Sequence, residues 1–281
     1  MSEGAPLEIE YAEHDGVALH ADLYRPKPSS TPFPILIAVH GGGWERGDRK
    51  SFRHWGTSLP QQGFGLLAIQ YRMAKPGKPA FPQAVHDVRA AVQYVRANAA
   101  DIGADSERIA LFGLSAGGHL AALAALAGDH PRFRGAYPEA PHAKLGTPVK
   151  AAVIGYGIFD AAAHWNADLA SRPGSSTIER FLGASMLDDR ELYFQASPLS
   201  YVTRKNNKTA FLVIYGMEDE VVDPQAQSKA FVAALGQVGA FVRTVAVPGA
   251  GHYWMSDPLD EAGSLTGAMA PKLVRFLHEK L

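Results

Sequence analysis

Four short stretches of this sequence hold residue types that could together carry out nucleophilic catalysis. The first is Gly113-Leu114-Ser115-Ala116-Gly117, which follows the apolar run Ile109–Phe112 and precedes an Ala/Leu-rich segment reaching Ala127. A G-x-S-x-G motif at such a strand-to-helix turn exposes its serine hydroxyl. The start of the following helix offers unpaired N–H groups and a positive dipole end. The pattern therefore predicts Ser115 as a nucleophile beside a site for negative charge.

The second stretch, His40-Gly41-Gly42-Gly43-Trp44, directly follows the predicted strand Ile35–Val39. Acyl transfer places negative charge on a carbonyl oxygen, and a glycine run lets backbone N–H groups approach that oxygen. An isolated glycine run more often forms a simple tight turn. Its pairing with the serine motif favours an oxyanion hole made by the amides of Gly42, Gly43 and Ala116. The side chain of His40 is expected to brace the glycine loop.

The third stretch supplies the acid and follows the predicted strand 210–215. Asp219 and Asp223 both stand where a carboxylate could hold a histidine in the required tautomer. Asp223 followed by Pro224 suits the cap and first position of a helix. We therefore assign Asp219 as the acid.

The fourth stretch supplies the base, His252, in a glycine-rich loop after the last predicted strand. The order Ser115, Asp219, His252 is the nucleophile–acid–base order of one known hydrolase arrangement. His252 is therefore the predicted general base. His119 falls one helical turn after Ser115 and is expected to pack or hydrogen-bond within its helix.

The elements that must position these residues alternate between strands and helices. Helical periodicity marks Phe81–Ala99, with Val85, Val88, Val92 and Val95 on one face. Further helices are expected at 225–235 and 265–280. The predicted strands are 7–13, 17–24, 35–39, 66–71, 109–112, 149–156, 210–215 and 241–247. An α/β fold is thus predicted, with a mostly parallel eight-stranded sheet, an N-terminal antiparallel hairpin turning at Asp15-Gly16, and helices on both faces.

Two segments, Gly128–Lys144 and Ala161–Ser200, lack clear periodicity and are rich in Pro, His, Asp and aromatic residues. Insertions between sheet elements are natural places for substrate walls. We expect one domain over 1–281, with cap-like insertions near 128–148 and 161–200.

Composition excludes several other classes. The 281 residues carry 27 basic and 28 acidic side chains, which speaks against nucleic-acid binding and membrane-surface binding. The start of the chain lacks the pattern of a signal peptide, so a cytoplasmic location is expected. There is no cysteine and no H-E-x-x-H motif, so we expect no metal and no cofactor.

Aromatic residues near the predicted carboxyl ends of strands could line a substrate pocket. The candidates are Trp44, Tyr156, Tyr253 and Trp254. Phe159 and Trp165 suit core packing equally well.

The motifs around Ser115 and Gly42 resemble those of the α/β-hydrolase superfamily, and within it the hormone-sensitive-lipase-like carboxylesterases. Tyr71-Arg72, Phe81-Pro82 and Asp87 also resemble that group. Within the superfamily, the chain is most similar to bacterial acetyl/feruloyl-type esterases and kynurenine-formamidase-like enzymes. Such proteins carry their acid in a Gly-x-x-Asp-x-x-Val string, which Gly216–Val222 matches, and this independently favours Asp219.

The resemblance implies a serine carboxylesterase that acts on short-chain or aryl esters through an acyl-enzyme and needs no cofactor. Its expected partner is a small-molecule ester, and a homodimer is left open. An amide hydrolase of the arylformamidase type would use the same triad. A prolyl-oligopeptidase-like peptidase would need a large extra domain, and a true lipase an extended apolar lid helix. A non-catalytic ligand-binding scaffold would have lost its base, whereas His252 is present.

Overall fold

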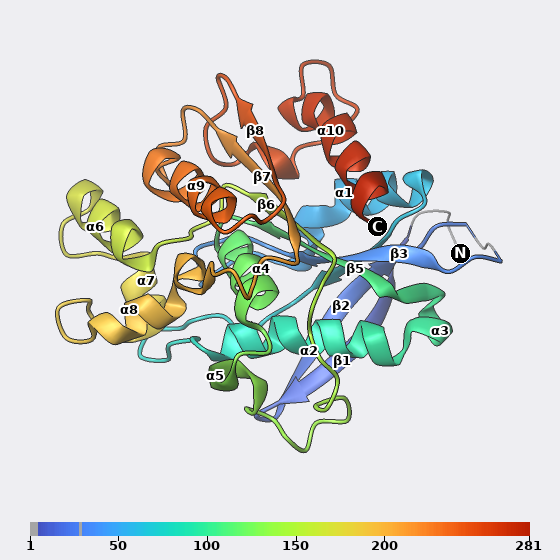
Figure 1. Cartoon of the computed structure of the whole chain (residues 1–281), viewed down its shortest axis with the longest axis horizontal. Coiled ribbons are helices and arrows are strands. Elements are labelled where there is room, and N and C mark those ends of the chain that lie inside the picture. Colours follow the sequence, from blue (N-terminus) through green and yellow to red (C-terminus); the bar gives the residue numbers. More distant parts are fainter. Residues whose placement is uncertain (1–4, 28–29) are drawn as a thin grey trace.

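The computed structural model describes residues 5–27 and 30–281 and is built around one sheet (Figure 1). Its eight strands lie in the order β1-β2-β4-β3-β5-β6-β7-β8. The β1–β2 and β2–β4 pairs are antiparallel and all other pairs are parallel. The strands are β1 Leu7–His14, β2 Val17–Tyr24, β3 Phe33–Val39, β4 Gly65–Ile69, β5 Ala104–Leu114, β6 Ala151–Gly155, β7 Ala210–Gly216 and β8 Val242–Val247. The predicted fold class is confirmed.

Helices cover both faces of the sheet, because the central strands are apolar throughout and must be buried on both sides. One core cluster joins the sheet to α2 Gln83–Ala97, α4 Ala116–Ala127 and α9 Ala230–Gln237. A second cluster joins the opposite face to α1 Arg53–Ser58 and α10 Leu265–Lys280. Figure 1 shows α2 and α10 on opposite sides of the sheet. The four valines predicted to form the buried face of α2 are at most 1% exposed.

Shorter helical turns complete the chain. They are η1 Arg49–Phe52, η2 Leu59–Gln62, α3 Ala99–Ile102, α5 Pro131–Arg134, the π-turn η4 Gln225–Lys229 and η5 Trp254–Ser256. The helix predicted over 225–235 therefore begins as a π-turn and continues as α9. No helix in the described ranges has both the length and the apolar character needed to cross a bilayer.

The segment 161–200 is helical, although its sequence shows no clear periodicity. It contains α6 Ala161–Ser171, α7 Thr177–Leu182, α8 Arg190–Ala196 and most of η3 Pro198–Tyr201. Each α-helix starts at a side chain that caps its first turn: Asp160, Ser176 and Asp189. The three α-helices contact one another and lie together at the left of Figure 1.

The segment 128–148 packs against α2 and the N-terminal hairpin. Gln93 on α2 donates hydrogen bonds to the carbonyls of Ala143 and Leu145, and the ring of Tyr137 stacks on His14 at 3.9 Å. These contacts place the segment along α2 and the hairpin. The cap-like role of both segments, 128–148 and 161–200, stays a prediction.

A buried ion-pair network ties the hairpin to α2. Asp87 is fully buried, and its Oδ1 lies 2.7 Å from Arg72 Nη2 and 2.8 Å from His14 Nδ1. Breaking one member of such a network costs about 3–5 kcal/mol because a buried charge is left without its partner. Arg72 and Asp87, which carried part of the family resemblance, therefore serve the scaffold.

Candidate active site

Ser115 occupies the turn between β5 and α4 with φ 54° and ψ −122°. This backbone conformation is rare for a residue with a side chain and costs roughly 1–3 kcal/mol. Two hydrogen bonds hold it: Ser115 N–H donates to Gly155 O at 2.9 Å, and His119 N–H donates to Ser115 O at 3.0 Å. The strained turn expected from the sequence is confirmed.

The motif's glycines allow strand and helix to approach at this turn. A Cβ atom on Gly117 would lie 2.0 Å from Val39 O, and one on Gly113 would lie 2.2 Å from Gly117 O. Neither position tolerates a side chain without backbone movement. The close packing therefore depends on these two residues.

The structure brings Ser115, His252 and Asp219 into one hydrogen-bonded chain. His252 Nε2 lies 2.8 Å from Ser115 Oγ, and His252 Nδ1 lies 2.7 Å from Asp219 Oδ2. A carboxylate only accepts, so His252 Nδ1–H donates to it and Nε2 is left to accept the serine proton. This is the arrangement of a nucleophile, a general base and an orienting acid.

Asp219 and Asp223 have distinct surroundings. Asp219 is 7% exposed, and its Oδ1 accepts from the amides of Val221 and Val222 at 2.9 and 2.8 Å. Asp223 is exposed and accepts from Gln225 N–H at 2.8 Å. Asp219 is thus the carboxylate that reaches His252.

Gly216, which opens the acid loop, lets this loop approach the loop of the base. A Cβ atom there would lie 2.2 Å from Ala250 O, and Glu218 N–H donates to the same oxygen at 3.0 Å. The Gly-x-x-Asp spacing thereby has a physical reason. The glycine permits the approach that brings Asp219 to His252.

The glycine loop after β3 lies against the nucleophile turn. A Cβ atom on Gly41 would be 3.1 Å from Ser115 Cβ, while Gly42 and Gly43 have φ 117° and 61°. Within the described residues, the amides of Gly42, Gly43 and Ala116 donate to no protein acceptor. Free amides beside a nucleophile are suited to stabilising a developing oxyanion.

His40 and Tyr71 support this loop from behind. His40 Nδ1–H donates to Gly41 O at 2.8 Å, and Tyr71 Oη–H donates to His40 O at 3.1 Å. Burial lowers the pKa of His40, so the ring is neutral there. Its expected bracing role agrees with these contacts.

His119 links the glycine loop to the helical segment 161–200. Trp44 Nε1–H donates to His119 Nδ1 at 3.2 Å, and His119 Nε2–H donates to Ala196 O at 2.7 Å. Burial lowers the pKa of His119 to about 4, which keeps the neutral form that can both accept and donate. The indole of Trp44 also stacks on Phe181 at 4.8 Å.

The four aromatic pocket candidates differ in exposure. Trp44, Tyr156 and Trp254 are 1%, 3% and 6% exposed, whereas Tyr253 is 75% exposed. The Tyr156 ring lies 4.6 Å from the ring of His252. Substrate contact by these residues stays a prediction, and Tyr253 offers the largest free surface beside the base.

One polar residue near the site was missed by sequence reasoning. His164 on α6 is 5% exposed, and its ring centre lies 6.1 Å from that of Trp44. It falls in the segment whose fold the sequence did not reveal. The signals that could have placed it are the helix caps Asp160 and Ser176, the latter followed by Glu179 in a capping-box spacing.

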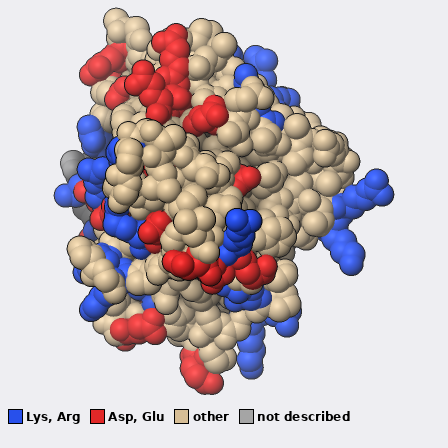
Figure 2. All heavy atoms as spheres, turned by 90° about the vertical axis from the view of Figure 1, so that its left-hand side faces the viewer, with Lys and Arg blue, Asp and Glu red and all other residues tan. Residues whose placement is uncertain are grey.

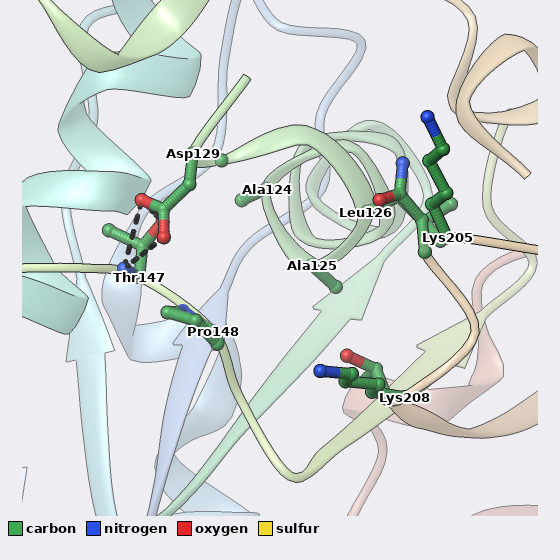
Figure 3. A pocket seen from close by; sticks show the side chains of 11 residues that line it. Ala124, Ala125, Leu126, Asp129, Thr147, Pro148, Lys205 and Lys208 are labelled. Atoms are coloured by element: carbon green, nitrogen blue, oxygen red, sulfur yellow. Dashed lines mark hydrogen bonds between the residues drawn. The ribbon is translucent and has the colours of Figure 1, made fainter. Parts of the chain in front are cut away.

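Two cavities lie elsewhere. One of about 180 Å³ lies at the end of α4, where Thr147 donates to Asp129 and Lys205 and Lys208 line the rim (Figure 3). Another of about 680 Å³ lies beside α10, lined in part by Ser58 and His278. Neither is lined by a residue of the triad or the glycine loop.

The face that carries α6, α7 and α8 displays small groups of charged side chains, with acidic and basic ones side by side at the centre and wide uncharged areas around them (Figure 2). Over residues 5–27 and 30–281, no three His, Asp or Glu side chains are grouped as metal ligands. The expectations of no nucleic acid, no metal and no cofactor remain predictions.

The eight-stranded sheet, with Ser115 at the turn between β5 and α4, has the α/β-hydrolase fold. The chain belongs to the BD-FAE family, whose model matches residues 21–235. It is 37% identical over 273 residues to esterase LipC of Mycobacterium tuberculosis, covering 94% of this chain and 63% of that protein. The chain spans about half to two thirds of the length of this and two other curated relatives that it matches.

Two solved structures show the same architecture. A Thermogutta terrifontis esterase is similar with a TM-score of 0.77 and 22% identity, over 99% of this chain and 93% of that chain. A bifunctional GH43-CE protein of Bacteroides eggerthii is similar with a TM-score of 0.81 and 26% identity, over 100% of this chain and 38% of that chain. The first of these likenesses bears on the fold alone.

Proposed function

We propose that this protein is a serine carboxylesterase that hydrolyses small-molecule esters of short-chain or aryl type. The observation that carries the proposal is the hydrogen-bonded chain from Ser115 Oγ through His252 to Asp219, set beside the unpaired amides of the glycine loop. The name esterase borne by LipC supports the same reaction.

In the proposed acylation step, Ser115 Oγ attacks the ester carbonyl carbon while His252 Nε2 accepts its proton. The carbonyl oxygen becomes an oxyanion and takes hydrogen bonds from the amides of Gly42, Gly43 and Ala116. Asp219 stabilises the imidazolium through Nδ1–H. Collapse of the intermediate breaks the bond to the alcohol, which leaves with the proton from His252.

Deacylation repeats these roles with water. His252 Nε2 accepts a proton from water as its oxygen attacks the acyl-enzyme carbonyl, and the same amides hold the second oxyanion. The acid is released, and Ser115 Oγ regains a proton from His252. Atoms and charges balance without any group beyond the protein, the ester and water.

The decisive experiment is steady-state hydrolysis of p-nitrophenyl esters from acetate to decanoate, with a phenyl formamide alongside. Ser115→Ala and His252→Ala are each expected to lower kcat by about 10⁴, since the remaining rate comes from the oxyanion hole and binding. Ser106→Ala, a serine outside the site, is the matched control and should retain the rate.

The outcomes separate the competing functions. Ser115-dependent turnover that peaks at short chains supports the proposal. A formamide hydrolysed faster than every ester would indicate an amidase. A folded protein without turnover on any ester would contradict the proposal.

A further inference from the structure

Two deeply buried histidines, His86 and His164, have rings without hydrogen-bond partners, and they differ in how accessible their ring nitrogens are. Both are at most 7% exposed, and neither ring donates to or accepts from another described residue. Both nitrogens of His86 are sealed from solvent among protein atoms. The ring nitrogens of His164 keep some accessible surface. His86 therefore serves as a packing residue in the core, whereas the ring nitrogens of His164 can hydrogen-bond a ligand.

His164 lies beside the glycine loop of the candidate active site, through its contact with Trp44. Its ring centre lies 6.1 Å from that of Trp44, in an edge-to-face arrangement, and Trp44 directly follows Gly43 of the glycine loop. The charges of His252 and Asp219 act on the pKa of His164, which burial lowers. The imidazole is therefore neutral and lies close to the proposed general base.

Asp168 joins α6, which carries His164, to the start of α7. Asp168 Oδ2 accepts from the amide and hydroxyl of Thr177, both at 2.8 Å, and from Ser176 Oγ at 3.1 Å. The Thr177 methyl carbon lies 3.9 Å from where a Cβ atom of Gly43 would stand. The α6–α7 segment thus forms a wall beside the proposed oxyanion donors.

Asp168 forms no hydrogen bond with the ring of His164. The Oδ2 atom already accepts three hydrogen bonds, Oδ1 accepts from Arg172 Nη2 at 2.7 Å, and the gap from His164 Nε2 to Oδ2 is 4.0 Å. A neutral imidazole offers one donor and one acceptor. A hydroxyl group can meet either one, whereas the neighbouring carboxylate disfavours an anion.

We propose that His164 is a specificity-determining residue that hydrogen-bonds a hydroxyl group carried by the ester substrate near its scissile carbonyl. This inference rests on the esterase function proposed above. An ester without the hydroxyl would displace water from His164 and leave the imidazole unpaired. Sites built to bind a hydroxyl reject analogues that lack it for this reason.

The test measures kcat/KM for two matched pairs of esters. Propyl butyrate and 2,3-dihydroxypropyl butyrate differ in the alcohol, and ethyl butyrate and ethyl 3-hydroxybutyrate differ in the acyl part. We expect the wild type to prefer the hydroxylated member of at least one pair by about tenfold or more. His164→Leu should lower that ratio at least fivefold, whereas His164→Asn, which keeps a donor and an acceptor, should retain part of it.

His278→Leu, on α10 outside the site, is the matched control and should leave the ratio unchanged. A kcat/KM ratio near one in the wild type, or an equal ratio in the wild type and His164→Leu, overturns the proposed hydroxyl subsite. In that case, Ser115-dependent turnover of the esters without a hydroxyl still supports the esterase function. Absence of turnover on all four esters overturns both. Because each ratio compares two substrates of one variant, a change in the folded fraction cancels.

Discussion

At the scale of single residues, the site depends on which carboxylate meets His252. Asp219 is fixed by two backbone amides and donates no proton of its own, whereas Asp223 stabilises the start of a helical turn. These two aspartates stand four residues apart in one loop. In the structure Asp219 is buried and contacts His252, whereas Asp223 is exposed.

This difference gives a sharp prediction for two matched substitutions. Asp219→Asn should lower kcat by about 10⁴, because an amide in place of the carboxylate favours the wrong tautomer of His252. Asp223→Asn should change kcat less than about threefold, since the amide oxygen can still accept from Gln225. Steady-state kinetics on p-nitrophenyl acetate measures both, and a larger loss in Asp223→Asn would move the acid role to Asp223.

At the scale of elements, the crossing of β3, β5 and α4 sets the position of the nucleophile. Two helical glycines serve as a matched pair. Gly117 meets Val39 O at the crossing, whereas Gly236 on α9 has no atom within 4 Å of an added Cβ. The same substitution therefore meets opposite environments.

Gly117→Ala should lower the free energy of unfolding by about 3 kcal/mol, because the added methyl group would overlap backbone atoms. Gly236→Ala should raise it by up to about 1 kcal/mol, since alanine is the better helix former. Urea unfolding followed by circular dichroism measures both. Equal effects of the two changes would show that the crossing is not tightly packed.

The Trp44–His119–Ala196 chain couples the oxyanion loop to α4 and α8. His119→Leu should lower kcat about tenfold to a hundredfold with little change in KM, because the loop would lose its anchor and misplace the oxyanion donors. His119→Asn keeps an acceptor and a donor and should retain most of the rate. A uniform rise in KM in both variants, with kcat unchanged, would indicate instead that His119 acts on substrate binding.

At the scale of the whole molecule, two buried histidines connect stability to pH. Burial lowers the pKa of His86 and of His119 to about 4, below the ordinary value of 6.5. Between these values the unfolded chain binds more protons than the folded protein. The contribution of these histidines to stability is therefore complete above about pH 6.5 and is lost as the pH falls towards 4.

His86→Phe should reduce this acid sensitivity. The rings of Phe133 and Tyr137 lie at 6.3 and 5.6 Å from His86, so an apolar ring suits the place. We expect the variant to lose up to about 3 kcal/mol less than the wild type between pH 6.5 and 4. Urea midpoints across this range test the prediction, and identical slopes in both proteins would contradict it.

The cytoplasmic location, the homodimer and the single-domain organisation belong to the same scale and remain predictions. The structure describes the fold of the chain and does not test these three predictions. The sheet, its antiparallel hairpin and the helices on both faces agree with the class predicted from alternating patterns.

The sequence by itself determined the parts of this protein that short-range chemistry encodes. The Ser115 turn, the glycine loop, the hairpin at Asp15-Gly16 and the helix 265–280 follow from patterns within a few residues, because periodicity and turn residues act locally. The order of the triad was readable for the same reason, since each member follows a recognisable strand.

Only the tertiary structure decided how deeply each aromatic candidate is buried and which distant residues it contacts. Trp44, which the sequence predicts as a pocket residue, is buried against Phe181 and His119, which lie 137 and 75 residues away along the chain. Its contact with substrate stays a prediction. His164 lies on α6, which Asp168 joins to Thr177 at the start of α7, and the methyl group of Thr177 lies beside Gly43. The burial and orientation of a side chain arise from contacts between distant segments, and local sequence patterns do not predict those contacts.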